Sequence, residues 1–212
     1  MRFTRLLAAL LAAVSAPAMV SDLGAQAPAA SSAGATRARV LPAAVQIASA
    51  TAAAPAEKRD GATVLGYAAD GRLTTLRAGT GDMVCLASDP ARDDFHVACY
   101  HKSLESFMAR GRELRAKGMS RGAADSARTA EITAGKLKMP AQPAALYSLT
   151  GPATSVDTAT GAVAGARSLY VVYIPFATAE STGLSATPAR GTPWIMLAGT
   201  PKAHIMFTPE MR

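Results

Sequence analysis

Two cysteines, Cys85 and Cys99, are the only thiols of the 212-residue chain. A turn-forming run, Asp89 to Asp94 (DPARDD), lies between them and favours an antiparallel hairpin centred near Arg92. In that register Cys85 faces Cys99, and directly opposed residues have Cβ atoms about 4.5–5.5 Å apart, close to disulfide geometry. The spacing therefore predicts a disulfide formed in an oxidising compartment. A pair of metal-binding thiolates is the alternative.

The chain has three histidines, and His96 is the one with acidic neighbours. Asp93, Asp94 and His96 could together crowd one metal ion at the tip of the same hairpin. Adjacent aspartates in a turn more often cap backbone amides, so we do not predict a metal site there. His101 cannot join His96 on a regular strand, because alternation places these two side chains on opposite faces.

His204 is the one residue that we nominate as a candidate functional centre. It lies in the apolar segment 203–207, where strand alternation puts His204 and Met206 on one face. A Thr200-Pro201 turn precedes it, so the imidazole is expected near a sheet end, where loop 177–192 could cover it. A buried imidazole needs hydrogen-bond partners, and a structural role is the simpler expectation.

Standard catalytic and cofactor motifs do not occur in the sequence. It contains no G-x-S-x-G elbow, no H-E-x-x-H and no C-x-x-C-H. Gly79-Thr80-Gly81 lacks the third glycine and the following helix of a dinucleotide loop, and no G-K-[ST] is present. We therefore name no catalytic residue, expect no cofactor and lean against an enzyme.

The chain is basic, with a net charge of +7 at pH 7. A surplus of this size permits contact with anionic surfaces of the cell envelope. The sequence has few aromatic residues, and nucleic-acid binding is not expected. The densest basic group could make such a contact, although a solvated helix face is the simpler expectation for it; its members are Lys102, Arg110, Arg112, Arg115 and Lys117.

The N-terminal segment has the three parts of a secretory signal. Arg2 and Arg5 precede a short apolar run, and small residues follow at A-x-A spacing, as in Ala25-Gln26-Ala27. We expect a signal peptide at 1–27, a disordered Ala/Ser/Pro-rich tether at 28–39 and one domain at 40–212. No second apolar run is long enough to cross a bilayer. The protein should therefore act in the periplasm or outside the cell.

Within 40–212 the sequence predicts an α+β fold: an antiparallel sheet of about seven to eight strands, two central helices and a short N-terminal helix. The helix near 40–55 should bury Leu41, Ala44, Val45, Ala48 and Thr51. Period-two segments joined by turns predict an antiparallel meander over 63–67, 73–77, 83–87 and 95–101. Ser103 should cap a helix that ends at Gly118, and a second helix should follow over 121–137.

Four more strands are expected near 145–149, 168–174, 194–197 and 203–207. Residues 169–174 are apolar throughout, which predicts a central strand buried on both faces. Two loops at 151–167 and 177–192 are long for a compact domain, so they are either functional or flexible.

Two segments resemble a group of uncharacterised exported bacterial proteins. One is Leu76-Arg77-Ala78-Gly79-Thr80-Gly81 before Cys85, a glycine turn preceding a cysteine. The other is a terminal G-T-P-x-A-H-I-M strand, here Gly199-Thr200-Pro201-Lys202-Ala203-His204-Ile205-Met206. The resemblance covers about residues 60–210 and implies export and a shared fold, with no particular chemistry. We expect a non-catalytic binding or structural protein of the envelope; the alternative is a metal-dependent or hydrolytic enzyme with a site near His204.

Overall fold

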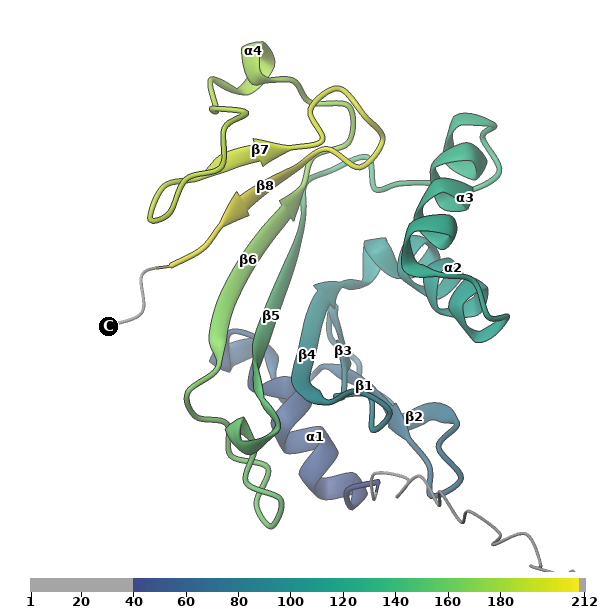
Figure 1. Cartoon of the computed structure of the whole chain (residues 1–212), viewed down its shortest axis with the longest axis vertical. Coiled ribbons are helices and arrows are strands. Elements are labelled where there is room, and N and C mark those ends of the chain that lie inside the picture. The colour runs from purple at the N-terminus through teal and green to yellow at the C-terminus, as the bar shows by residue number, and fades with distance from the viewer. Residues whose placement is uncertain (1–39, 210–212) are drawn as a thin grey trace, which may run out of the picture. The chain divides into compact units, whose positions relative to one another are not determined.

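The computed structural model describes residues 40–209, so the predicted signal peptide (1–27) and tether (28–39) lie outside the described residues. An eight-stranded, mostly antiparallel sheet carries the fold, in the order β2-β1-β3-β4-β5-β6-β8-β7 (Figure 1). Its strands are β1 (Thr63–Tyr67), β2 (Leu73–Arg77), β3 (Met83–Leu86), β4 (Asp94–His101), β5 (Ala144–Pro152), β6 (Arg167–Tyr173), β7 (Trp194–Met196) and β8 (His204–Phe207). The α-helices are α1 (Ala43–Thr51), α2 (Glu105–Ala116), α3 (Arg121–Thr133) and α4 (Ala179–Thr182), with 3-10 turns η1 (Ala56–Lys58), η2 (Lys102–Leu104) and η3 (Ala153–Ser155). The predicted α+β class is confirmed.

The first four strands do not form the meander that their turn signals predict. Strand β1 pairs antiparallel with β2 but parallel with β3, so the chain crosses from the sheet edge to the far side of β1. Gly79 and Gly81 allow this crossing, because a Cβ on them would lie 2.3 and 2.8 Å from the Gly61 carbonyl oxygen. The Gly81 amide donates a 2.8 Å hydrogen bond to the same oxygen. The glycine segment is thus a close passage of one backbone against another.

The β3–β4 hairpin has the register that the sequence predicts. Cys85 pairs with Cys99, and Leu86 pairs with Ala98. Beyond the end of β3 the hairpin is held by the Ser88 hydroxyl, which accepts a 3.0 Å hydrogen bond from the His96 amide. Strand β4 then pairs along its length with β5, which places it well inside the sheet.

The two faces of the sheet are covered by different helices. On one face, alanines of α1 and the turn after it pack on Val64, Cys85, Val97 and Cys99, which are fully buried. On the other face, Leu104 at the start of the helical hairpin packs with Val84, Tyr100 and Ala144. Alternation along β4 produces this division, because successive side chains point to opposite faces. Within residues 40–209, no helix combines the length and the apolar composition needed to cross a bilayer.

Helix α1 buries a different face from the one predicted. Val45 and Thr51 are buried as expected, but Ala44 and Ala48 are exposed, whereas Gln46 is buried. The Gln46 side chain accepts from the Tyr67 amide at 2.8 Å and donates to the Tyr67 carbonyl oxygen at 2.9 Å. It therefore extends the β1 edge by two hydrogen bonds, which offsets the cost of burying an amide. Hydrophobic periodicity cannot reveal such a contact.

Helix α2 begins differently from the prediction that Ser103 caps it. The 3-10 turn η2 starts the helical segment, and the His101 ring nitrogen accepts from the Ser103 amide at 3.3 Å. Gly118 ends the segment as expected, with a positive φ of 85°. Helix α3 follows at once, with the Ser120 hydroxyl as its N-cap, and ends at Thr133 rather than near 137, where Gly135 adopts a φ of 70°.

Strand β6 is central in pairing but is not buried on both faces. Only Val171 is buried, and Tyr170 is 39 % exposed. Helix α1 contacts the strands at the other end of the sheet, so the face of β6 is covered by aromatic neighbours instead. The Tyr170 ring stacks on Phe207 at 6.2 Å and meets the edge of Tyr147 at 5.7 Å.

The two predicted long loops contain short ordered elements. Strand β5 and turn η3 extend into the first loop, and a bridge joins Val156 to Val163. Helix α4 lies in the second loop, with a capping box at Thr178. Near the second loop, Phe176 and Leu197 are large, exposed residues with positive φ angles of 65° and 55°.

Candidate functional site

Cys85 and Cys99 form a disulfide, as the hairpin register predicts. Both residues are fully buried on the face that α1 covers. Ala50 of α1 and Val97 of β4 belong to the same cluster. Because it is buried among apolar residues, the disulfide is part of the hydrophobic core.

Two of the three candidate metal residues at the hairpin tip, Asp94 and His96, are engaged in other contacts. Arg92 pairs with Asp94 at 2.7 Å, and Asp93 is exposed. Nδ1 of His96 and the Thr150 hydroxyl share a hydrogen bond of 2.8 Å. Across residues 40–209, His, Cys, Asp and Glu side chains form no group of three that could hold a metal ion.

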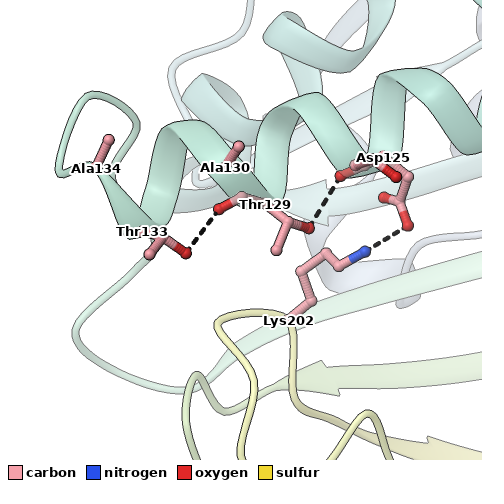
Figure 2. A pocket seen from close by; sticks show the side chains of 7 residues that line it. Asp125, Thr129, Ala130, Thr133, Ala134 and Lys202 are labelled. Atoms are coloured by element: carbon pink, nitrogen blue, oxygen red, sulfur yellow. Dashed lines mark hydrogen bonds and ion pairs between the residues drawn. The ribbon is translucent and has the colours of Figure 1, made fainter.

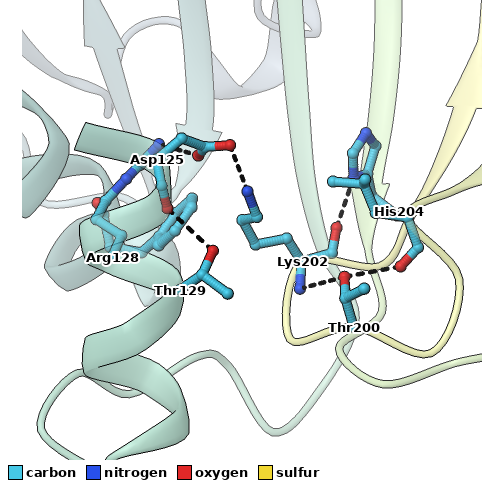
Figure 3. Close-up of polar contacts among 8 residues, drawn as sticks. Asp125, Arg128, Thr129, Thr200, Lys202 and His204 are labelled. Carbon is cyan, nitrogen blue, oxygen red and sulfur yellow. Dashed lines mark hydrogen bonds and ion pairs between the residues drawn. The ribbon is translucent and has the colours of Figure 1, made fainter. Parts of the chain in front are cut away.

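His204 lies between strands β6 and β7 and is buried (Figure 3). Its Nδ1–H donates to the Lys202 carbonyl oxygen at 2.7 Å, and its ring lies 5.2 Å from that of Tyr173. Burial lowers the pKa of His204, and the hydrogen bond to the Lys202 carbonyl only partly opposes this. The imidazole is therefore a neutral, packed group near pH 7.

An ion pair ties α3 to the turn before β8. Lys202 bonds to Asp125, which also accepts from Arg128 at 2.8 Å (Figure 3). Burial acts to raise the pKa of Asp125, but the hydrogen bond and charge of Lys202, with the charge of Arg128, outweigh it and lower the pKa. This contact joins two segments that are 77 residues apart. It fixes the helical hairpin against the C-terminal strands.

A wide hollow lies beside this ion pair, along one side of α3 (Figure 2). Its lining is one helix face of small residues together with Lys202; the helix residues are Asp125, Ser126, Thr129, Ala130, Thr133 and Ala134. The Thr129 and Thr133 hydroxyls both donate to backbone carbonyls one turn earlier. Apart from Ser126, the polar side chains of the hollow are thus used within the helix and its ion pair.

A cavity of about 280 Å³ lies on the α1 side, near the β3–β4 hairpin. Several of its polar side chains are engaged in other contacts. Gln46 bonds to the β1 backbone, Ser49 donates to the Gln46 carbonyl oxygen, and Arg92 pairs with Asp94. These contacts engage the polar groups that α1 brings to the cavity.

Another cavity differs from these two because its walls carry several cationic groups. It has a volume of about 230 Å³ and lies between the sheet and the helical hairpin. We call it the arginine pocket and define it by Arg112 and Arg115 of α2, Arg128 of α3, and His96 and Tyr100 of β4. Apolar side chains complete the lining, among them Leu86, Ala98, Met108 and Leu146.

Arg128 is the most constrained of the three arginines. Its guanidinium lies 3.9 Å above the Phe107 ring, and its Nη1 donates to the Phe107 carbonyl oxygen at 3.2 Å. Only 12 % of the side chain is exposed. Its Nε–H is buried and has no hydrogen-bond partner among the described residues. Such an unsatisfied donor costs about 1–3 kcal/mol, unless an acceptor enters the pocket.

Gly111 makes room for this guanidinium. It lies in the middle of α2, where glycine costs about 1 kcal/mol relative to alanine. A Cβ at Gly111 would lie 2.8 Å from Nη1 of Arg128, which is too close for the present arrangement. Helix α2 is therefore intrinsically less stable at the position where the Arg128 guanidinium packs against its backbone.

Arg112 is balanced by acidic and phenolic partners. It donates to Glu105 at 2.6 Å and to the Tyr100 hydroxyl at 2.8 Å, and that hydroxyl donates to Glu105 at 2.6 Å. Burial raises the pKa of Tyr100, so the phenol stays protonated. The triad fixes Arg112 in the pocket wall and leaves it little capacity for a further charge.

Arg115 has no such balance. Within residues 40–209, neither Arg115 nor Arg121 forms an ion pair with a carboxylate. Arg115 is exposed overall, but partial burial lowers its pKa, and the charges of Arg128, Arg121 and Arg112 lower it further. Arg115 therefore lies among like charges.

His96 contributes a neutral imidazole to the pocket. Burial is the main cause that lowers its pKa; Arg92 adds to the effect, and Asp94 opposes it. The ring is held by Thr150 on the neighbouring strand, its register partner. His96 therefore offers hydrogen bonding rather than charge near pH 7.

The structure separates the five basic residues that the sequence groups together. Arg110 pairs with Glu113 and Glu131, and Lys117 pairs with Glu113. The Lys102 ammonium donates to the Gly81 carbonyl oxygen. Arg112 and Arg115 instead line the arginine pocket, together with Arg128 and Gly111, whose roles the sequence does not reveal. Phe107 and Gly111 are one helical turn apart, so the sequence does place them on the same face of α2. It does not show that Arg128 of α3 packs on that face.

Comparisons with protein families, with curated proteins and with solved structures find no match to this chain.

Proposed function

We propose that this protein is an exported domain that binds a small ligand in the arginine pocket without transforming it. One observation carries the proposal: Arg128, which lines the pocket, has a buried Nε–H with no acceptor among the described residues. Because the neighbouring sheet and helices hold that guanidinium rigidly, an acceptor on a ligand would satisfy it at little further cost in entropy.

A binding role without catalysis is supported by how the histidines are used. His204 donates its Nδ1–H to a backbone carbonyl and packs on Tyr173. His96 is held at Nδ1 by the Thr150 hydroxyl. In each case a ring nitrogen serves the packing of the sheet, which suits structural histidines better than a general base.

Export is supported by the sequence of residues 1–27 and by the disulfide. The basic start, apolar run and A-x-A spacing are those of a secretory signal. A buried Cys85–Cys99 bond is in keeping with an oxidising compartment, such as the periplasm or the medium.

The test uses the full chain, expressed in a Gram-negative host and purified from the periplasm. Intact mass should show a mature N-terminus between Met19 and Ala30. Retention of Met1 on envelope-localised protein would contradict export.

Binding is then tested by thermal shift against a panel of anionic, neutral and cationic metabolites. Ala98→Leu fills the pocket from β4, and Thr75→Leu makes a comparable change on the exposed strand β2. A pocket ligand should stabilise the wild type and Thr75→Leu but not Ala98→Leu. Saturation at about 100 times the dissociation constant adds about 2.7 kcal/mol to the free energy of unfolding. A panel without any such compound would contradict the binding role, and turnover that requires His204 would favour the enzyme alternative.

A further inference from the structure

The charges around the arginine pocket do not cancel. Arg112 is matched by Glu105, and Arg128 shares Asp125 with Lys202. Arg115 lines the pocket without a carboxylate partner in the described part of the chain, and the positive charge of Arg121 acts on it from outside the lining. The pocket therefore holds a surplus of positive charge with no counterion from residues 40–209.

Arg128 adds a directed donor to this charge. Its Nη1 and Nη2 are taken by the Phe107 carbonyl and the Asp125 carboxylate, whereas its buried Nε–H has no partner there. A guanidinium prefers planar oxygen acceptors such as those of carboxylate, phosphate and sulfate groups. An acceptor that also reaches Arg115 would contact two guanidinium groups on different helices.

The rest of the pocket is apolar and small. Leu86, Leu146 and Met108 line it beside the arginines, within a volume of about 230 Å³. Ligand pockets for drug-sized molecules are commonly about 300–1,000 Å³, so this one suits a compact organic group that carries the anion.

Building on the ligand-binding function proposed above, we propose that the ligand carries a phosphate- or sulfate-type oxyanion, which Arg115 and the Nε–H of Arg128 bind in the arginine pocket. A phosphate monoester carries about −1.5 to −2 charges at pH 7. It therefore balances more of the positive charge around the arginine pocket than a carboxylate, which carries a single negative charge. Its several oxygens allow both helices to bind the same group.

The probe is inorganic phosphate, followed by sulfate and phenyl phosphate, in NMR titrations of the mature exported protein at constant ionic strength. Arg115→Gln removes one guanidinium at an exposed helix position, so the fold should be retained. Lys117→Gln is the matched control, because it removes one charge from the same helical segment outside the pocket. We expect Arg115→Gln to raise the dissociation constant for phosphate at least ~10-fold, the factor for losing a hydrogen bond between charged groups. Lys117→Gln should change it less than ~2-fold, because salt screens distant surface charges.

Arg128→Lys provides a second, independent variant. It keeps the positive charge but lacks the Nε–H and the planar fork, so phosphate should bind more weakly although the net charge is unchanged. Equal affinity in the wild type and in both arginine variants would overturn the proposal. Equal losses in Arg115→Gln and Lys117→Gln would also overturn it, because they would show a response to net charge alone.

Two sources could supply such an oxyanion, a soluble ester or a lipid headgroup. Tight binding of phenyl phosphate without co-sedimentation on phosphatidylcholine/phosphatidylglycerol vesicles identifies a soluble ester. Co-sedimentation that Arg115→Gln abolishes and Lys117→Gln preserves identifies a headgroup. If phosphate and sulfate do not bind, but a neutral compound stabilises the wild type and not Ala98→Leu, the oxyanion proposal fails and the binding function stands. If no compound distinguishes Ala98→Leu from the wild type, both fail.

Discussion

Replacing Gly111 by alanine tests directly how Arg128 is held. In an unobstructed helix interior this change raises the free energy of unfolding by about 1 kcal/mol, because alanine restricts the unfolded chain and favours the helix. Here the new Cβ would meet Nη1 of Arg128 at 2.8 Å, so the guanidinium has to move. The sign of the effect therefore depends on what Arg128 loses.

The loss can be worked from its contacts. The guanidinium would leave its position 3.9 Å above Phe107, a cation–π contact worth about 1–2 kcal/mol when largely desolvated. It would also weaken the hydrogen bond to the Phe107 carbonyl oxygen, worth about 1 kcal/mol. After subtracting the gain in helix propensity, we expect Gly111→Ala to lower the free energy of unfolding by about 1–2 kcal/mol.

A double-mutant cycle with Arg128→Met isolates this coupling. In the Arg128→Met background the obstructing atoms are gone, and Gly111→Ala should stabilise the protein by about 1 kcal/mol. Urea unfolding followed by circular dichroism measures all four proteins. The opposite signs in the two backgrounds are the expected result. If Gly111→Ala stabilises both backgrounds equally, Arg128 is not confined by Gly111 and the description of the pocket wall is wrong.

Three further changes probe other parts of the fold. The Cys85–Cys99 bond joins residues that are 14 positions apart in the sequence. Its reduction should lower the free energy of unfolding by about 3 kcal/mol in the chain-entropy model. Equal urea midpoints for the oxidised and the reduced protein would argue against this. The folded-state pKa of His204 is lowered from 6.5. As the pH falls, the unfolded chain therefore takes up a proton first, and the free energy of unfolding should fall below about pH 6.5. The dependence of this free energy on pH should be shallower in His204→Gln, and an unchanged dependence would show that His204 does not contribute. Leu197→Asn should raise stability by about 1 kcal/mol, because asparagine tolerates the positive φ of 55° at this exposed position; a lower thermal midpoint would show that the leucine side chain has a packing role.

Local signals predicted the central hairpin and the helical segments well. The register of Cys85 with Cys99 follows from turn chemistry and simple counting, because both strands flank one short turn. The parallel pairing of β1 with β3 could not be found in this way. It depends on a close approach of Gly79 and Gly81 to Gly61, and the sequence alone does not say which backbone segment lies nearby.

Burial was harder to predict where polar side chains replace apolar ones. Gln46 is buried because it pairs with the β1 backbone, although glutamine is mostly an exposed residue in proteins. The same limit applies to the arginine pocket. Arg115 and Lys117 are two residues apart and look equivalent in sequence, but one lines the pocket and the other pairs with Glu113 at its surface. Only the packing of α3 beside α2 distinguishes them.

The order of strands at the C-terminal side of the sheet constrains how the sheet can be completed during folding. Strand β8 lies between β6 and β7, although β7 precedes it in the chain. Until β8 is inserted, the edge of β6 that faces it is open, and β7 lacks its neighbour in the sheet. An unpaired strand edge is a site for pairing with other chains. Insertion of β8 therefore completes the sheet and covers that edge.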